Sequence, residues 1–427
     1  MASTIELNAN TGLSSPGVKL HGSGFIVTLN EAKKLGLGSV SGIEEHIVPY
    51  RNGRDLADRP RGVLVIDLHG LSAEQVRQRF PRIYEHVLTK VKPERDSNNE
   101  AYRRENWWLF GRKNTDLRGF LAGLGRYIST GETSKHRVFQ FLDGSIRPDN
   151  MLVNFGLSDA LHLGVLSSRI HVVYALAAGG RLGVGNDPRY NKSRCFDPFP
   201  FPDCTEKQKE KIRALAEELD AHRKRAQATH QLGLTDIYNV LEKVRAGTAL
   251  TAKDKAIHDA ALVSTLKQLH DDLDAAVAAA YGWPWPLADA EILERVVALN
   301  AARAAEEAQG QIRWLRPDYQ IPLLAGTSQS ALNLGEGKPA KSPKGTAAKN
   351  PQSKIRIPKS KIPWPKPLAD RVRVVEAALA AEEEPATAAT LAKRFTRAQA
   401  ADVAEILDTL VTLGRARPGD IAGTFVH

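Results

Sequence analysis

The chain has 427 residues, of which 42% are hydrophobic and 25% charged, and its formal net charge is +10. This length allows about two to four domains of roughly 100–200 residues each. The only cysteines, Cys195 and Cys204, argue against a disulfide framework and a zinc site, and no metal site is expected. No signal peptide is visible, and no apolar run approaches the roughly 20 residues that span a bilayer. We therefore expect a cytoplasmic protein with no membrane partner.

Residues 1–204 are expected to form a mixed α/β domain. Short strands are predicted at Gly24–Val27, Gly62–Leu68 and Arg137–Leu142. Ser72 is a candidate cap for a helix over Ser72–His86. The apolar circumference of Asp159–Ala178 predicts a single, mostly buried helix.

Residues 205–324 are expected to form a helical layer. Helices are predicted at Thr205–Ala228, Leu234–Ala246, Asp254–Tyr281 and Glu291–Gln309. The first has apolar residues at the i, i+3, i+4 and i+7 positions that define one face of a helix. The overall fold class is therefore α+β, with the helical layer following the mixed domain.

Residues 325–365 are predicted to be a flexible Lys/Pro-rich linker. Between 328 and 366 the net charge is +8, whereas residues 1–204 carry a net +6. The linker could therefore add salt-dependent, non-specific DNA affinity, or it could be a mere spacer. Residues 366–427 are expected to form a small winged-helix-like domain, with helices at Leu368–Ala381, Thr387–Phe395 and Arg397–Leu413.

The most distinctive run lies at 179–202, where Gly-Gly-Arg-Leu-Gly-Val-Gly-Asn-Asp-Pro-Arg-Tyr-Asn-Lys-Ser-Arg is followed by Cys-Phe-Asp-Pro-Phe-Pro-Phe-Pro. Its glycines and prolines favour an irregular loop, and its cationic side chains suit an anionic partner. Together with Leu20–Val27, Pro49–Leu56, Asn106–Gly111 and Arg313–Gln320, this run resembles the recognition region of the MmeI-like, type IIL adenine-specific DNA methyltransferases of restriction–modification and phage-defence systems.

The resemblance implies a DNA target recognition domain that binds double-stranded DNA for N6-adenine methylation. The methyl-transfer motifs of such enzymes are missing, because the chain has no Pro-Pro dipeptide and no strand, Gly-rich turn and helix in the order that holds the cofactor. No catalytic residue and no cofactor-binding residue is therefore assigned. S-adenosyl-L-methionine is implied only for a missing catalytic domain, which a separate methyltransferase chain could supply.

The resemblance also points to Gly183–Arg189, just after Gly180-Arg181-Leu182, as the residues that read bases. Asn186, Asp187 and Arg189 are the candidates, because their side chains match the hydrogen-bonding edges of bases. Further DNA contacts are predicted for Arg181, Asn191, Lys192 and Arg194, the last three of them to phosphates. The alternative is a structural turn with an internal ion pair between Asp187 and an arginine.

A basic run between residues 112 and 137 offers a second candidate surface. Its predicted DNA contacts are Arg112, Lys113, Arg126 and Lys135, with an ordinary solvated face as the alternative. DNA contacts and a structural turn remain equally open for Arg51, Arg54 and Asp55, whereas Trp107 and Trp108 are assigned to the core in preference to base stacking. Asp55, Asp67 and His69 lack a convincing nuclease pattern, and His136, His162 and His171 are assigned structural roles.

Two other classes of function are compatible with the chain. It could be a complete methyltransferase or nuclease with unrecognised catalytic residues. It could instead be a non-catalytic protein-interaction module, with its C-terminal helices contacting partners.

Overall fold

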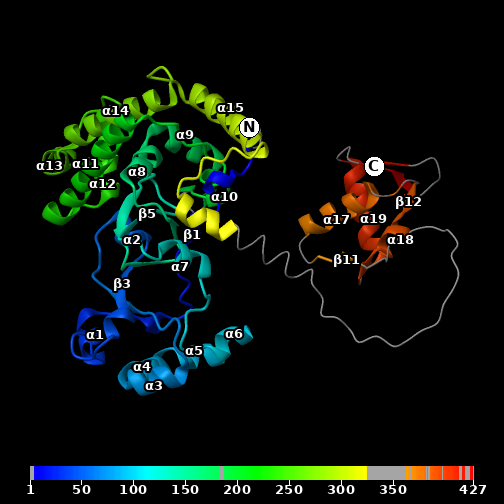
Figure 1. Cartoon of the computed structure of the whole chain (residues 1–427), viewed down its shortest axis with the longest axis horizontal. Helices are drawn as coiled ribbons and strands as arrows, with labels where there is room; N and C mark the ends of the chain where they lie inside the picture. The colour runs from blue at the N-terminus through cyan, green and yellow to red at the C-terminus, as the bar shows by residue number, and fades with distance from the viewer. Residues whose placement is uncertain are drawn as a thin grey trace. The chain divides into compact units, whose positions relative to one another are not determined.

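The computed structural model describes residues 4–182 and 187–324 and parts of 362–426. The described C-terminal parts are 362–365, 368–380, 382, 385–396, 398–412, 416–418 and 424–426. The chain forms two compact units, Met1–Gly337 and Lys338–His427, which are coloured from blue to yellow and from orange to red in Figure 1. The finer division predicted at residues 204, 324 and 365 stays a prediction.

Two four-stranded sheets form the centre of the first unit. The first sheet is antiparallel throughout, in the order β1 (Ser14–Pro16), β8 (Leu152–Phe155), β5 (Arg126–Gly131) and β6 (Gln140–Asp143). The second has the order β2 (Ile26–Val27), β4 (Leu64–Ile66), β3 (Ile47–Arg51) and β7 (Arg147–Pro148). In it only the β3–β7 pair is parallel. The strands predicted at Gly24–Val27, Gly62–Leu68 and Arg137–Leu142 correspond to β2, β4 and β6, although each observed strand is shorter or shifted.

Short helices surround the second sheet. They are α1 (Leu29–Leu35), α2 (Gly53–Ala57), α3 (Ala73–Arg79), α4 (Pro81–Lys90), α5 (Lys92–Asp96), α6 (Ala101–Glu105) and α7 (Thr115–Leu121), with 3-10 turns at Asn8–Asn10, Ser23–Phe25 and Ile43–Glu45. Ser72 caps α3 as predicted, in a reciprocal pair with Gln75. The single helix predicted over Ser72–His86 is wrong, because Pro81 disfavours helical geometry at Phe80 and starts a new helix.

The helical layer follows the first sheet. Its members are α8 (Ala160–Ser167), α9 (Arg169–Ala178), α10 (Lys192–Cys195), α11 (Glu206–His230), α12 (Leu234–Arg245), α13 (Ala252–Ala260), α14 (Val263–Tyr281) and α15 (Asp289–Ala308), and residues 317–324 are also helical. Figure 1 shows α11 to α14 gathered at one end of the unit and α1 and α3 to α6 at the other, with the sheets between them. The predicted helices at Thr205–Ala228, Leu234–Ala246 and Glu291–Gln309 are confirmed as α11, α12 and α15.

Two long helices predicted in this region are each broken in two. Asp159–Ala178 bends by 61° at Ser168, whose extended backbone lets its hydroxyl cap α9. Asp254–Tyr281 breaks at Leu262, which has the left-handed φ of 47°. No single helix among the described residues is long and apolar enough to cross a membrane, and only the bent pair α8 and α9, taken together, meets both conditions.

The second unit has its own core and the element order predicted for a winged helix. Its elements are β11 (Ile362–Pro363), α17 (Leu368–Ala380), β12 (Ala386–Thr387), α18 (Ala388–Ala392), β13 (Phe395–Thr396), α19 (Ala400–Thr412), β14 (Arg417–Pro418) and β15 (Thr424–Val426). Val375, Leu379, Leu391, Val403 and Leu407 are buried together. The α+β class with a helical layer is therefore confirmed.

Candidate nucleic-acid interface

The glycine-rich run folds as a two-stranded hairpin on the first unit. Strand β9 (Gly180–Leu182) pairs antiparallel with β10 (Asp187–Arg189), so that Arg181 lies opposite Pro188. The sharp start of the hairpin requires Gly179, because a Cβ there would lie 2.3 Å from the carbonyl oxygen of Arg189. Arg181 and Arg189 are exposed, and Asp187 is half-buried. Residues 183–186, including the predicted base reader Asn186, lie outside the described residues.

The base of the hairpin is fixed by a buried arginine. Arg137 is 8% exposed, and its guanidinium donates to the carbonyl oxygen of Pro188 at 3.0 Å, to Thr130 Oγ1 at 3.2 Å and to the carbonyl oxygen of Gly131. Burial lowers the pKa of Arg137 to about 10, so the side chain stays charged at neutral pH. The Tyr190 amide also donates to the Glu132 carbonyl oxygen at 2.7 Å. The hairpin therefore leaves the domain at a defined place and angle.

A buried aromatic cluster contains Tyr190, the residue that follows strand β10 of the hairpin. Tyr190 is 1% exposed, lies edge-on to Phe139 and Phe155, and its hydroxyl is 3.0 Å from His171 Nε2. Burial lowers the pKa of His171 to about 3, so this ring is neutral at ordinary pH. His162 is half-buried, and its desolvation lowers its pKa to about 4. These contacts agree with the structural role assigned to the histidines.

The charged residues of the hairpin run have partners within the protein. Arg189 pairs with Glu132 at 2.6 Å, and Lys192 pairs with Asp197 at 2.9 Å. The described partner of Arg189 is thus Glu132 and not Asp187, and an ion pair between Asp187 and another arginine stays a prediction. These pairs are partly exposed, with 44% of the Arg189 side chain and 38% of the Lys192 side chain accessible, so each holds its cation only weakly.

Two further residues of the run lie at helix α10. Asn191 caps the helix by accepting a hydrogen bond from the Ser193 amide at 3.1 Å, which gives its side-chain oxygen a structural role. Arg194 is exposed, and its carbonyl oxygen accepts from the Tyr174 hydroxyl at 3.1 Å. Contacts of Asn191, Lys192 and Arg194 with phosphate stay predictions.

The structure does not bring the predicted contacts of the 112–137 run together. Arg126 and Lys135 belong to opposite ends of β5, because the strand begins at Arg126 and the loop that holds Lys135 follows its end. Arg126 makes a two-bond ion pair with Glu217 and lies 3.8 Å from the centre of the Phe141 ring. Only Lys135 lies beside the hairpin, where its ammonium donates to Asn239.

Arg112 and Lys113 lie elsewhere, beside a buried ion cluster. In this cluster Arg118 and Arg147 donate to Asp67 at 2.8–2.9 Å. Burial opposes ionisation of Asp67, but the two guanidinium groups lower its pKa below the ordinary value. Arg112 and Lys113 are themselves exposed.

The two acids that were considered as nuclease residues, Asp55 and Asp67, form ion pairs with arginines. Asp55 accepts two side-chain hydrogen bonds from Arg61, each at 2.8 Å, and Asp67 is held as described above. Within the described residues, no three His, Cys, Asp or Glu side chains gather in a way that could hold a metal ion.

The paired tryptophans belong to the core. Trp107 is 9% exposed and packs edge-on against Tyr84, and the Trp108 indole donates to the Leu71 carbonyl oxygen at 2.9 Å. Their assignment to the core, and not to base stacking, is confirmed.

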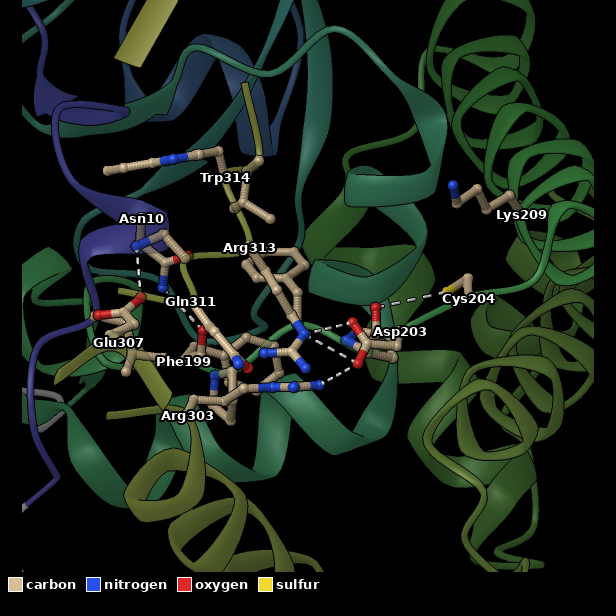
Figure 2. Close-up of a pocket in the computed structure, with 16 residues that line it drawn as sticks. Asn10, Phe199, Asp203, Cys204, Lys209, Arg303, Glu307, Gln311, Arg313 and Trp314 are labelled. Atoms are coloured by element: carbon tan, nitrogen blue, oxygen red, sulfur yellow. Dashed lines mark hydrogen bonds and ion pairs between the residues drawn. The ribbon is translucent and has the colours of Figure 1, made fainter. Parts of the chain in front are cut away.

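A pocket of about 260 Å³ is lined by the Phe-Pro run, by Leu7 to Asn10 and by residues between Arg303 and Leu315. Figure 2 shows the side chains that line it. Asp203 binds Arg303 at 2.7 Å and Arg313 at 3.0 Å, and Glu307 accepts from the backbone amides of Asn8 and Ala9. These charged groups are thus occupied by one another and by the backbone. At this pocket the residues before β1 are hydrogen-bonded to the last turns of α15.

Some residues that shape the interface carry no local signal in the sequence. Glu132 looks like any exposed acid, and only its place in the loop after β5 brings it to Arg189, 57 positions away. The importance of Arg137 likewise depends on the packing of Pro188 against the loop. The only hint in the sequence is that an arginine directly precedes the mostly apolar run Val138–Leu142.

Comparisons with known proteins bear on this arrangement. No family model and no curated protein matches the chain. Among solved structures, the chain is similar to the type IIL restriction-modification enzyme MmeI, determined in complex with DNA, with a TM-score of 0.50 and 17% identity. This chain shares that fold. The similarity covers 71% of this chain and 37% of the enzyme's chain, so the present chain spans well under half of that protein.

Proposed function

We propose that the chain is the DNA sequence recognition portion of an adenine-specific (N6) DNA methyltransferase in a restriction–modification or phage-defence system. The observation that carries the proposal is the anchored, exposed hairpin within a fold shared with an enzyme that was solved with DNA. Base recognition requires side chains that are presented from a rigid support at a fixed register, and the buried Arg137 and Tyr190 provide such a support. In this proposal the partner is double-stranded DNA and the protein acts in the cytoplasm.

Methyl transfer is assigned to a domain outside the described fold, on another chain or elsewhere in a longer protein. The Gly-rich stretch at His21–Gly24 leads into the 3-10 turn Ser23–Phe25 and then strand β2. It therefore lacks the following α-helix whose N-terminus holds a dinucleotide or adenosyl cofactor. S-adenosyl-L-methionine accordingly belongs to the missing catalytic part.

Selection of duplexes from a random pool tests the proposal. The unmodified protein is expected to enrich one short, asymmetric sequence. Arg189→Ala is expected to relax the preference at one position, at a cost of about 1–3 kcal/mol there, because the arginine exchanges Glu132 for a base edge. Lys192→Ala is expected to weaken all duplexes alike, as loss of a phosphate contact does. Equal, poor binding of selected and random duplexes would refute the proposal, and transfer of a labelled methyl group by this chain alone would overturn the assignment of catalysis elsewhere.

A further inference from the structure

Two pockets lie beside helix α2, and the first of them also borders the hairpin. The first, of about 350 Å³, is lined by Arg54 on α2 and by Asp187 on the hairpin. The second, of about 530 Å³, is lined by Arg59 and by Gln231, which follows α11. The buried Leu56 and Gln140 line both pockets, and the Gln140 side-chain amide donates to the Leu56 carbonyl oxygen at 3.3 Å. We call the two pockets together the α2 groove, which therefore borders both the proposed base-reading element and α2.

Five cations line the α2 groove, and the described partners of three of them are neutral. Arg51 donates to the carbonyl oxygen of Tyr50 at 3.2 Å, Arg59 donates to the Gln231 amide oxygen at 2.8 Å, and Lys135 donates to the Asn239 amide oxygen.

The fourth cation, Arg54, lies 3.9 Å from Asp58, with side chains that are 80% and 49% exposed. An ion pair this long and this exposed contributes almost nothing to stability. The positive charge along the groove is therefore not cancelled by these contacts.

The acids that line the groove do not balance these cations. Asp55 is already neutralised by its two hydrogen bonds with Arg61. Asp143, which accepts from the amide and hydroxyl of the neutral Ser145, and Asp187 at the hairpin end are two negative charges against the four cations above. Lys224, a further cation of the second pocket, is paired with Asp220 at 2.6 Å and adds no free charge. Two neighbouring pockets with an excess of cations, the exposed Arg54 and Arg59 among them, fit a polyanion better than a small molecule.

We propose that the α2 groove binds the sugar–phosphate backbone of the DNA whose bases the hairpin reads, with Arg54 and Arg59 contacting phosphates. This inference rests on the proposed function, because it takes the partner of the hairpin to be duplex DNA. Phosphate contacts fix the register of a protein on the duplex and carry no sequence information. The groove would thus hold the duplex in place while the hairpin discriminates between bases.

The test compares the salt dependence of DNA binding, measured by fluorescence anisotropy between 50 and 200 mM KCl, for a selected and a scrambled duplex. Each phosphate contact contributes about 0.9 to the slope of log K against log salt concentration. In the double variant Arg54→Ala/Arg59→Ala, the magnitude of this slope is expected to fall by about two. The variant is expected to bind both duplexes more weakly by the same factor and to select the same sequence. Arg54→Lys, which keeps the charge, is expected to retain the slope.

Arg77→Ala is the matched control, because Arg77 is an exposed arginine on α3, away from the groove. An unchanged slope in the double variant, or the same fall in the control, would overturn the inference. So would a change of base preference at one position with the slope retained, since that indicates base reading. If the unmodified protein binds DNA without sequence preference and the double variant still lowers the slope, the proposed function fails while the groove assignment stands.

Discussion

Replacing Arg137 by methionine separates the anchoring of the hairpin from the general stability of the fold. Arg137 is buried, and its guanidinium donates hydrogen bonds to Thr130, Gly131 and Pro188. Methionine fills much of the same volume and donates no hydrogen bond. The variant therefore removes the link between the loop after β5 and strand β10 while it preserves most of the packing.

The expected cost follows from two opposing effects. A hydrogen bond from a charged donor contributes about 1.5–3 kcal/mol, so three bonds amount to about 5–9 kcal/mol. The fall of the Arg137 pKa from 12.5 to about 10 shows that burial penalises the charge, and at 1.36 kcal/mol per pH unit this penalty is about 3 kcal/mol. Methionine removes the penalty together with the bonds, so we expect a net loss of about 2–6 kcal/mol in the free energy of unfolding.

Arg95→Met is the matched control. Arg95 is 1% exposed and donates to the carbonyl oxygens of Leu20 at 2.7 Å and Leu109 at 3.0 Å, far along the chain from the hairpin. Both variants are expected to lose stability in urea denaturation. Only Arg137→Met is expected to speed hydrogen exchange at the Tyr190 amide and to flatten the sequence preference in duplex selection. Retained preference in Arg137→Met, or an equal loss in Arg95→Met, would refute the anchoring role.

Three further outcomes are expected. Trp107→Ala should cost about 3–5 kcal/mol in urea denaturation, because the ring is 9% exposed in the core, and it should leave the selected DNA sequence unchanged. Arg126→Gln should lower stability by no more than about 1 kcal/mol, since its ion pair with Glu217 is 38% and 48% exposed, whereas a loss of DNA affinity would support the phosphate contact predicted from the sequence. Because the pKa of His162 falls from 6.5 to about 4 on folding, its neutral form stabilises the protein above pH 6.5, and that stability is lost as the pH falls toward 4. Thermal denaturation at pH 7 and pH 5 should show about 2 kcal/mol less acid destabilisation in His162→Gln; an unchanged difference would contradict burial of this ring.

The sequence was most informative where local chemistry decides the structure. Thr205 and Gln208 form the capping pair that starts α11, and the apolar spacing from Ile212 to Leu219 gives that helix its buried face. Such signals depend on residues within one or two helical turns, so they are visible without the rest of the fold. The prediction for residues 205–324 counted one helix where α13 and α14 are two, and it gave no helix at residues 317–324.

The breaks in the helices were less visible. Pro81 carries its own signal, because the residue before a proline avoids helical geometry. Ser168 and Leu262 carry none of comparable strength. Each takes a non-helical backbone in the folded domain, which neither residue type requires.

The sequence by itself determined that residues 179–194 are rich in glycine and in cationic side chains, but the irregular loop predicted there is wrong, since its described residues form strands β9 and β10 and helix α10. Only the tertiary structure decided what holds that segment and what faces it. Arg137 reaches Pro188 across 51 positions, and Arg54 borders the same groove as Asp187, although more than 100 residues separate them in the chain. Contacts of this kind depend on how two sheets and a helical layer pack, and no periodicity or spacing in the chain specifies them.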